Sequence, residues 1–166
     1  LRAGAYKQRL SPYVFEGLNE EALKALRRTA DHNGLLTVTE IVDASQAAMM
    51  EQYVDLLLVG SRNMQNYGLL SALGKTKRPV LLKRGLGATV EELLVSADYI
   101  LSGGNYDVIL CERGIRTFEN SSPNTFDIAA IPSVKRVSHL PILGDASRGA
   151  GRRDKVAPLA RAAVAA

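Results

Sequence analysis

Arginine and lysine side chains follow short apolar runs at intervals along the whole chain, and their chemistry suits anions. The cations in these places are Arg2, Lys7, Arg9, Arg62, Lys83, Arg84, Arg113, Arg116, Arg148, Arg152 and Arg153. Arginine forks bind carboxylate and phosphate groups through two N–H donors at once, and lysine supplies a point charge. Taken singly, Arg84 and Arg153 are expected to be solvated. Recurrence at five of the six run ends nevertheless indicates a ligand with at least two anionic groups, such as a phosphorylated small molecule.

The segment LGDASRGAGRRD, residues 143–154, carries the densest group of these cations. An apolar run ends at Asp145, and a loop of small residues then bears Arg148, Arg152 and Arg153. Three guanidinium groups so close together repel one another unless water or an anion surrounds them. The segment therefore raises the question whether Arg148 belongs to an anion site.

Other kinds of chemistry have little support in the sequence. The chain has no C-x-x-C, H-E-x-x-H or G-x-x-x-x-G-K-[ST] motif, so the common zinc, redox and P-loop patterns are missing. We expect His32 and His139 to be surface or capping residues rather than ligands. Cys111 lies inside an apolar run and is expected in the core. Glu112, one position on, is expected to stabilise a neighbouring cation.

Two kinds of segment alternate along the chain and would position these side chains. Short runs rich in Leu and β-branched residues are predicted strands, namely Leu1–Lys7, Leu35–Ile41, Leu56–Gly60, Val80–Lys83, Val108–Glu112 and Pro141–Asp145. Amphipathic stretches between them are predicted helices, namely Asn19–Asn33, Ser45–Tyr53, Asn63–Leu73, Thr89–Leu101, Asn124–Val137 and Asp154–Ala165. Continuous apolar strands in strict alternation with helices predict a parallel sheet that is covered by helices.

The predicted fold class is α/β, and the pattern favours a (β/α)₈ TIM barrel over an open doubly wound sheet. A G-x-G-x-x-G motif after the first strand would indicate a Rossmann fold and is missing, and GLGAT at 85–89 matches it only weakly. About six βα units are present, whereas barrel closure takes eight. We therefore expect one partial barrel domain over residues 1–166. In both folds, ligands bind beyond the C-terminal ends of the strands, where the cations stand.

Composition narrows the partners and the compartment. The net charge is +4, but aromatic residues make up only 5%, Trp is absent and the cations are scattered in pairs, which favours a small anion over nucleic acid. No apolar run approaches the roughly 18 residues of a membrane span. The lone Cys111 cannot form an internal disulfide, which favours the cytoplasm. Two strand edges without partners predict a homo-oligomer.

Seven segments, in order along the chain, resemble those of a known enzyme family. They read AYKQRLSPYVFEGL, VGSRNMQN, PVLLKRG, VILCERGIRTFE, NTFDIAAIP, SHLPIL and GRRD. They are similar to segments of the microbial 3-deoxy-D-arabino-heptulosonate-7-phosphate (DAHP) synthases, in the subclass related to the 3-deoxy-manno-octulosonate-8-phosphate synthases. The resemblance covers essentially the whole chain and implies a (β/α)₈ barrel. It also implies the condensation of phosphoenolpyruvate with erythrose 4-phosphate, which opens the shikimate route to aromatic amino acids.

The resemblance further implies roles for individual cations. The residues that match the family's phosphoenolpyruvate site are Arg2, Lys7, Arg62, Lys83 and Arg113, with Lys83 and Arg113 as the catalytic pair. The family's K-P-R-T motif for the second substrate stands here as KQRL at 7–10, in which Arg9 keeps a phosphate contact. The arrangement Lys-x-Arg-x-Ser-Pro-Tyr favours the heptulosonate branch.

The resemblance also implies a divalent metal ion, of the Mn, Mg, Zn or Fe class, that polarises the sugar aldehyde as a Lewis acid. One metal ligand in the family is the His of a D-P-S-H motif, which aligns with residues 145–148, where this chain has Arg148. A guanidinium is cationic and cannot ligate a metal, and Cys111 is not a ligand position of the family. Two hypotheses follow. The chain is a condensing synthase, or it is a non-catalytic paralogue that binds phosphoenolpyruvate or phosphate and has lost its metal site.

Overall fold

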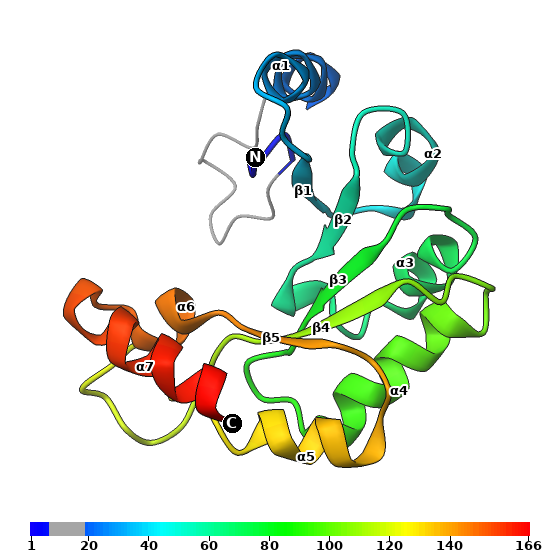
Figure 1. Ribbon diagram of the computed structural model, residues 1–166. Coiled ribbons are helices and arrows are strands. Elements are labelled where there is room, and N and C mark those ends of the chain that lie inside the picture. The colour runs from blue at the N-terminus through cyan, green and yellow to red at the C-terminus, as the bar shows by residue number, and fades with distance from the viewer. Residues whose placement is uncertain (7–18) are drawn as a thin grey trace.

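A computed structural model describes residues 1–6 and 19–166 of the chain (Figure 1). The described residues form a parallel sheet of five strands, β1 Val38–Ile41, β2 Leu56–Val59, β3 Val80–Lys83, β4 Val108–Glu112 and β5 Ile142–Gly144. Each strand pairs with the next one in the sequence, in the order β1-β2-β3-β4-β5. A doubly wound sheet reverses its strand order at a switch point, whereas a barrel does not. The fold is therefore α/β of the TIM-barrel type, as predicted.

The first predicted strand, Leu1–Lys7, is wrong for the residues that the structure describes. Only Arg2 forms a parallel bridge, to Val38. Beyond it, the Ala3 carbonyl accepts a hydrogen bond from Thr39 Oγ1 at 2.7 Å rather than from a strand backbone. Alanine and glycine have low strand propensity. Here the Thr39 hydroxyl replaces the next backbone hydrogen bond that a continued strand would make. The described sheet thus has five strands where six were expected.

The helices that follow the strands are shorter than predicted in three places. Their bounds are α1 Asn19–His32, α2 Ala47–Met50, α3 Tyr67–Leu73, α4 Val90–Leu101, α5 Ala130–Val137, α6 Ala146–Ala150 and α7 Arg153–Ala165, with 3₁₀ turns η1 at Ala44–Gln46 and η2 at Ser61–Asn63. Helix α3 starts late because Asn66 caps it through Leu69 N, and α5 starts late because Thr125 bridges to Ile115. Helix α6 was not predicted. Among the described residues, no helix has the length and apolarity needed to cross a membrane.

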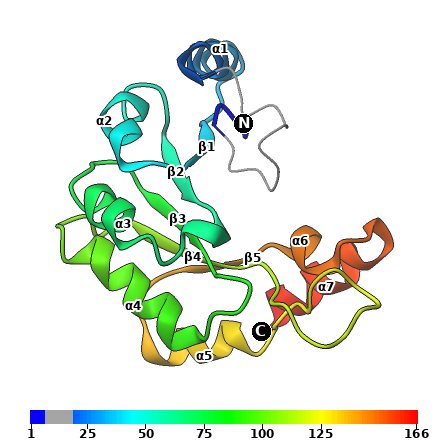
Figure 2. The same cartoon turned by 180° about the vertical axis from the view of Figure 1, so that it is seen from behind.

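The two faces of the sheet are buried in different ways (Figures 1 and 2). Helices α2, α3, α4 and α5 lie on one side, and the strand residues in the core there are Ile41, Leu57, Val59, Val80, Leu82, Val108 and Leu110. We call this side the helix face. On the opposite side, the inner face, Leu58, Leu81 and Cys111 form a smaller cluster. Because side chains alternate along a strand, residues two positions further on extend from the same inner face.

Candidate functional site

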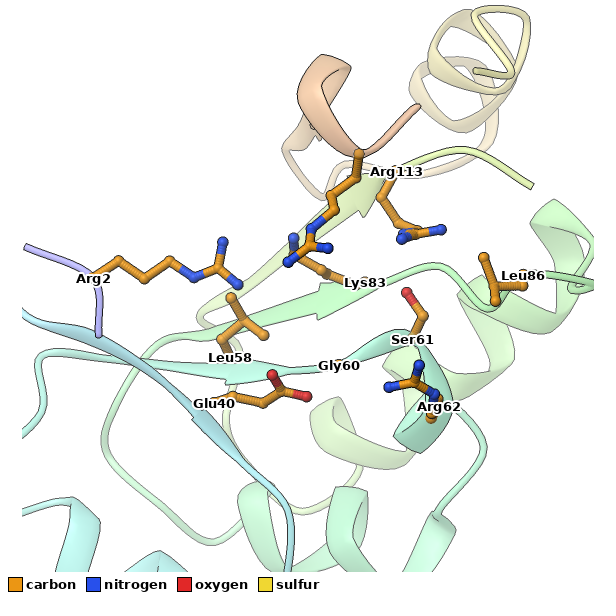
Figure 3. A pocket seen from close by; sticks show the side chains of 10 residues that line it. Arg2, Glu40, Leu58, Gly60, Ser61, Arg62, Lys83, Leu86 and Arg113 are labelled. Carbon is orange, nitrogen blue, oxygen red and sulfur yellow. The ribbon is translucent and has the colours of Figure 1, made fainter. Parts of the chain in front are cut away.

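A cavity of about 130 Å³ lies at the C-terminal ends of the strands, on the inner face (Figure 3). Its lining consists of Arg2, Glu40, Leu58, Gly60, Ser61, Arg62, Lys83, Leu86, Arg113 and Arg148. Five of these ten residues are cations, contributed by the N-terminal segment, by the ends of β2, β3 and β4, and by α6 after β5. We call them the cavity cations. The described members of the predicted phosphoenolpyruvate site, Arg2, Arg62, Lys83 and Arg113, all lie in this group, whereas Lys7 and Arg9 lie outside the described residues.

Strand alternation explains how the sequence brings the cavity residues together. Lys83 follows Leu81 by two positions, and Arg113 follows Cys111 by two, so both side chains continue the inner face. Gly60 stands in the same relation to Leu58. A Cβ on Gly60 would lie only 2.1 Å from Glu40 Oε1, so a side chain at this position would displace the Glu40 carboxylate. The alternation of side chains along β2, β3 and β4 therefore places the residues at the strand ends in the cavity lining.

Lys83 is held by a short ion pair in the wall of the cavity. Its ammonium lies 2.6 Å from Asp145 Oδ2, and only 7% of the lysine is exposed. Burial acts to raise the pKa of Asp145, but the hydrogen bond and charge of Lys83 outweigh it, so the pKa lies below its ordinary value of 3.8. Asp145 is thus ionised at neutral pH and fixes the lysine while offsetting its charge.

Arg113 is half-buried and has neutral partners. Its Nη1 donates to Asn124 Oδ1 at 3.1 Å and to the Gly114 carbonyl at 3.5 Å. Within residues 1–6 and 19–166, no carboxylate forms a salt bridge with this guanidinium. Burial and then the nearby charge of Arg148 lower the pKa of Arg113 from its ordinary value. An anion placed beside Arg113 would relieve both effects.

Arg2 and Arg62 reach the cavity from its open rim. Arg2 sits on the N-terminal segment beside β1, and its side chain extends toward the cavity, across from Arg113 (Figure 3). Arg62 lies in the 3₁₀ turn that follows β2, next to Ser61. Both arginines are exposed, so they are accessible to an incoming anion.

Arg84 corrects one expectation from the sequence. It is not solvated: only 5% of it is exposed, and Nη1 lies 2.8 Å from Glu112 Oε2 and 2.7 Å from Asp127 Oδ2. Because Arg84 follows Lys83 directly, strand alternation turns it to the helix face. Glu112, expected to stabilise a neighbouring cation, does so here and is fully buried. We call Arg84, Glu112 and Asp127 the buried ion cluster.

Several other predicted residues lie outside the cavity. Arg116 and Arg153 are exposed and do not line it, and Arg152 pairs with Asp154 on the surface at 2.9 Å. His32 and His139 are exposed, as expected. The three arginines of residues 143–154 therefore do not form one anion site, because Arg148 alone lines the cavity. Sequence reasoning missed Glu40 and Asn124, which carry no motif of their own.

The described residues do not fit a divalent metal ion at the position implied by the family resemblance. Arg148 stands at the aligned His position and has no lone pair to donate. Burial raises the pKa of the Cys111 thiol to about 11, so it is protonated at neutral pH. Both Asp145 oxygens already accept hydrogen bonds, Oδ2 from Lys83 and Oδ1 from Ser147 and from the backbone of Arg148. Over residues 1–6 and 19–166, no three His, Cys, Asp or Glu side chains gather in a metal-binding arrangement.

Comparison with known proteins agrees with the resemblance seen in the sequence. The model of the DAHP synthetase I family matches residues 1–166. A phospho-2-dehydro-3-deoxyheptonate aldolase of Thermotoga maritima is 53% identical, over 99% of this chain and 49% of its own length. A 2-dehydro-3-deoxyphosphooctonate aldolase of Chromobacterium violaceum is 28% identical, over 97% of this chain and 60% of its own length.

Solved structures give the same result for the fold. The crystal structure of the Thermotoga maritima aldolase (DAHP synthase) superposes with a TM-score of 0.92 at 51% identity, covering 99% of this chain and 47% of that one. A truncated form of 3-deoxy-D-arabino-heptulosonate 7-phosphate synthase from Thermotoga maritima gives 0.89 at 50% identity, covering 99% and 59%. The chain spans about half the length of the relatives that it matches.

Proposed function

Because the chain belongs to the DAHP synthetase I family, we propose that its cavity binds phosphoenolpyruvate and that the protein acts in the condensation of phosphoenolpyruvate with erythrose 4-phosphate. One observation carries this proposal: every described cation that the family pattern assigns to phosphoenolpyruvate lines the same 130 Å³ cavity. A ligand with a phosphate and a carboxylate matches cations that approach from several sides. The reaction is the first step of the shikimate route to aromatic amino acids.

The proposed roles follow from the position of each cation. Lys83 and Arg113 stand deepest, at the ends of β3 and β4, and we assign them the catalytic contacts with phosphoenolpyruvate. Arg2 and Arg62 hold its anionic groups from the rim. Fixed cations around a reacting phosphate and carboxylate stabilise charge that develops in the transition state, at no cost of reorganisation during the reaction. Lys7 and Arg9, which precede α1, are proposed contacts for phosphoenolpyruvate and for the sugar phosphate.

A second function has its own supporting observation, the poor fit of the described residues to a metal ion. In the family a divalent metal supplies the Lewis acid that polarises the aldehyde. With Arg148 at the aligned His position and both Asp145 oxygens engaged, this chain lacks those donors among its described residues. The alternative is therefore a non-catalytic paralogue that binds phosphoenolpyruvate or free phosphate in the same cavity.

Two measurements distinguish these functions. Consumption of phosphoenolpyruvate is followed with erythrose 4-phosphate and added Mn²⁺, and a rate above the protein-free blank supports the synthase. A rate equal to the blank, together with a rise in melting temperature on adding phosphoenolpyruvate alone, supports the binding paralogue. If millimolar phosphoenolpyruvate neither reacts nor shifts the melting temperature, both functions are wrong.

The remaining partners and the compartment are also proposals. We propose a homo-oligomer, because β5 forms an edge of the described sheet and Leu143 on it is 48% exposed. Light scattering behind a sizing column tests it, and a mass of one chain would contradict it. We propose a cytoplasmic protein with small-molecule rather than nucleic-acid partners, supported by the lone buried Cys111 and by cations gathered in one small cavity.

A further inference from the structure

Arg148 is fixed in the cavity wall by a residue that also fixes another cavity cation. The Asp145 side chain caps α6 and accepts a hydrogen bond from the backbone N–H of Arg148 through Oδ1, at 3.2 Å. Its other oxygen, Oδ2, accepts from Lys83 Nζ at 2.6 Å. One carboxylate therefore sets the distance between the ammonium of Lys83 and the helix that carries Arg148.

A second residue makes the same kind of link to Arg113. Asn124 Oδ1 accepts from Arg113 Nη1 at 3.1 Å, and Asn124 Nδ2 donates to the backbone carbonyl of Arg148 at 3.0 Å. The loop that carries Asn124 is itself anchored, since Asp127 pairs with the buried Arg84 at 2.7 Å. The backbone of Arg148 is thus held by two side chains, Asp145 and Asn124, that also bind the cavity cations Lys83 and Arg113, and the Arg148 side chain lines the cavity from there.

Two of the cavity cations, Arg113 and Arg148, have no salt-bridge partner among the described residues. Of the ten lining residues five are cations, and Glu40 is the one acid among them in the part of the chain that the structure describes. The salt bridges of residues 1–6 and 19–166 include none to Arg113 or Arg148. Arg148 contributes to the lowered pKa of Arg113, so the two charges lie close enough to repel. The charges of Asp145 and Glu112 offset burial and this repulsion only in part, since the pKa of Arg113 is still lowered, and an oxyanion between the two guanidinium groups would remove the remaining cost.

We propose that Arg113 and Arg148 form an oxyanion subsite, which takes a carboxylate or phosphoryl group of the ligand without a divalent cation. The sequence raises the question whether Arg148 belongs to an anion site, and the family resemblance indicates it as the sign of a lost metal ligand. Its place in the cavity adds a positive role, because a guanidinium brings a fixed charge and paired N–H donors to the position. The subsite rests on the proposed function for the identity of the ligand, but not for oxyanion binding itself.

Calorimetric titration of inorganic phosphate and, separately, phosphoenolpyruvate tests the subsite, with EDTA present in every titration except a separate one that contains Mn²⁺ in its place. The variants are Arg148→Ala, Arg148→Lys and the matched control Arg28→Ala, which removes an exposed arginine from α1. We expect Arg148→Ala to weaken both ligands about tenfold, as for the loss of one charged hydrogen-bonding partner. Arg148→Lys should lose about threefold, because it keeps the charge and loses the fork. Arg28→Ala should bind as wild type, and adding Mn²⁺ should not tighten binding.

Each outcome separates the subsite from the proposed function. If phosphoenolpyruvate binds equally well to wild type and to Arg148→Ala, the subsite is wrong and the proposed function stands. If phosphoenolpyruvate fails to bind but phosphate binds in an Arg148-dependent way, the proposed function is wrong and the subsite stands. Wild type that binds neither anion, or that needs Mn²⁺ to bind, overturns the subsite. Melting curves of all variants show whether a loss of affinity reflects a loss of folding.

Discussion

Lys83 and Arg84 are neighbours in the sequence, yet they belong to two regions with opposite charge balance. Lys83 pairs with Asp145 in the wall of the cavity, where four further cations and one acid line an open space among the described residues. Arg84 faces the helices, where it meets Glu112 at 2.8 Å and Asp127 at 2.7 Å, and both Arg84 and Glu112 are buried. Accessible positive charge suits an anion-binding site, whereas a buried cation that pairs with carboxylates suits a structural role. Charge balance and access, rather than the number of cations, distinguish the two regions.

The largest expected effect is on stability, in the buried ion cluster. Arg84→Ala leaves the Glu112 carboxylate buried without its partner, and we expect the free energy of unfolding to fall by about 3–5 kcal/mol. Arg113→Met is the matched control in the cavity and should cost less than about 1 kcal/mol, because Arg113 has no carboxylate partner among the described residues. Urea denaturation measures both. Equal losses in the two variants would remove the distinction between the regions.

The next effect concerns Cys111, which is buried on the inner face in a cluster with Leu58 and Leu81. Burial raises the pKa of its thiol from 9.0 to about 11. A pKa raised in the folded state adds stability that is fully present below pH 9 and is lost as the pH rises through 11, by about 2–3 kcal/mol. Urea denaturation at pH 8 and at pH 11 should show this loss, and Cys111→Ala should lack that part of it. A thiol that titrates near its ordinary pKa would mean that water reaches the inner-face cluster around Cys111.

A cavity substitution that costs little stability should cost much ligand affinity. Arg113→Met removes a cation that faces the ligand, and we expect phosphoenolpyruvate to bind about thirtyfold more weakly, as for one partner of a desolvated charge pair. A change of less than about threefold, measured by calorimetry, would place the ligand away from Arg113. Arg136→Met, on the exposed face of α5, serves as the control and should leave binding unchanged.

The smallest effect should come from Asn124, a positioning residue that joins Arg113 to α6. Asn124→Ala removes both hydrogen bonds, and we expect about a fivefold loss of phosphate affinity with the charges intact. In the double variant with Arg148→Ala, the two losses should not add, because the substitutions act on the same subsite. Fully additive losses would show that Asn124 acts elsewhere, and Asn33→Ala, at the exposed end after α1, is the matched control.

The sequence predicts some parts of this structure because they depend on local pattern. Apolar runs locate β1 to β5, and a cavity residue lies within a few positions of the end of each strand. The faces of the sheet on which Lys83 and Arg84 lie follow from the alternation of side chains along β3, although the identity of their charge partners does not. The first residues of the helices are harder to predict, since the side-chain cap at Asn66 and the bridge from Thr125 to Ile115 override the amphipathic pattern.

Contacts between distant segments could not be predicted from the sequence. Asn124 and Arg148 lie in different loops and helices, and nothing in either segment indicates their hydrogen bond. Asp145 likewise meets Lys83 only because β3 and β5 flank β4. Family resemblance supplied the cations but not their spacing or their partners, so the role of Arg148 depends on the folded chain.

A crystal structure of the chain grown with phosphoenolpyruvate and EDTA tests the central claim most directly. We expect the ligand in the cavity, with one anionic group within hydrogen-bond distance of both Arg113 and Arg148 and the other near Lys83 or the rim arginines Arg2 and Arg62. A ligand bound outside the cavity, or bound in it with Arg148 turned to solvent, would contradict the account.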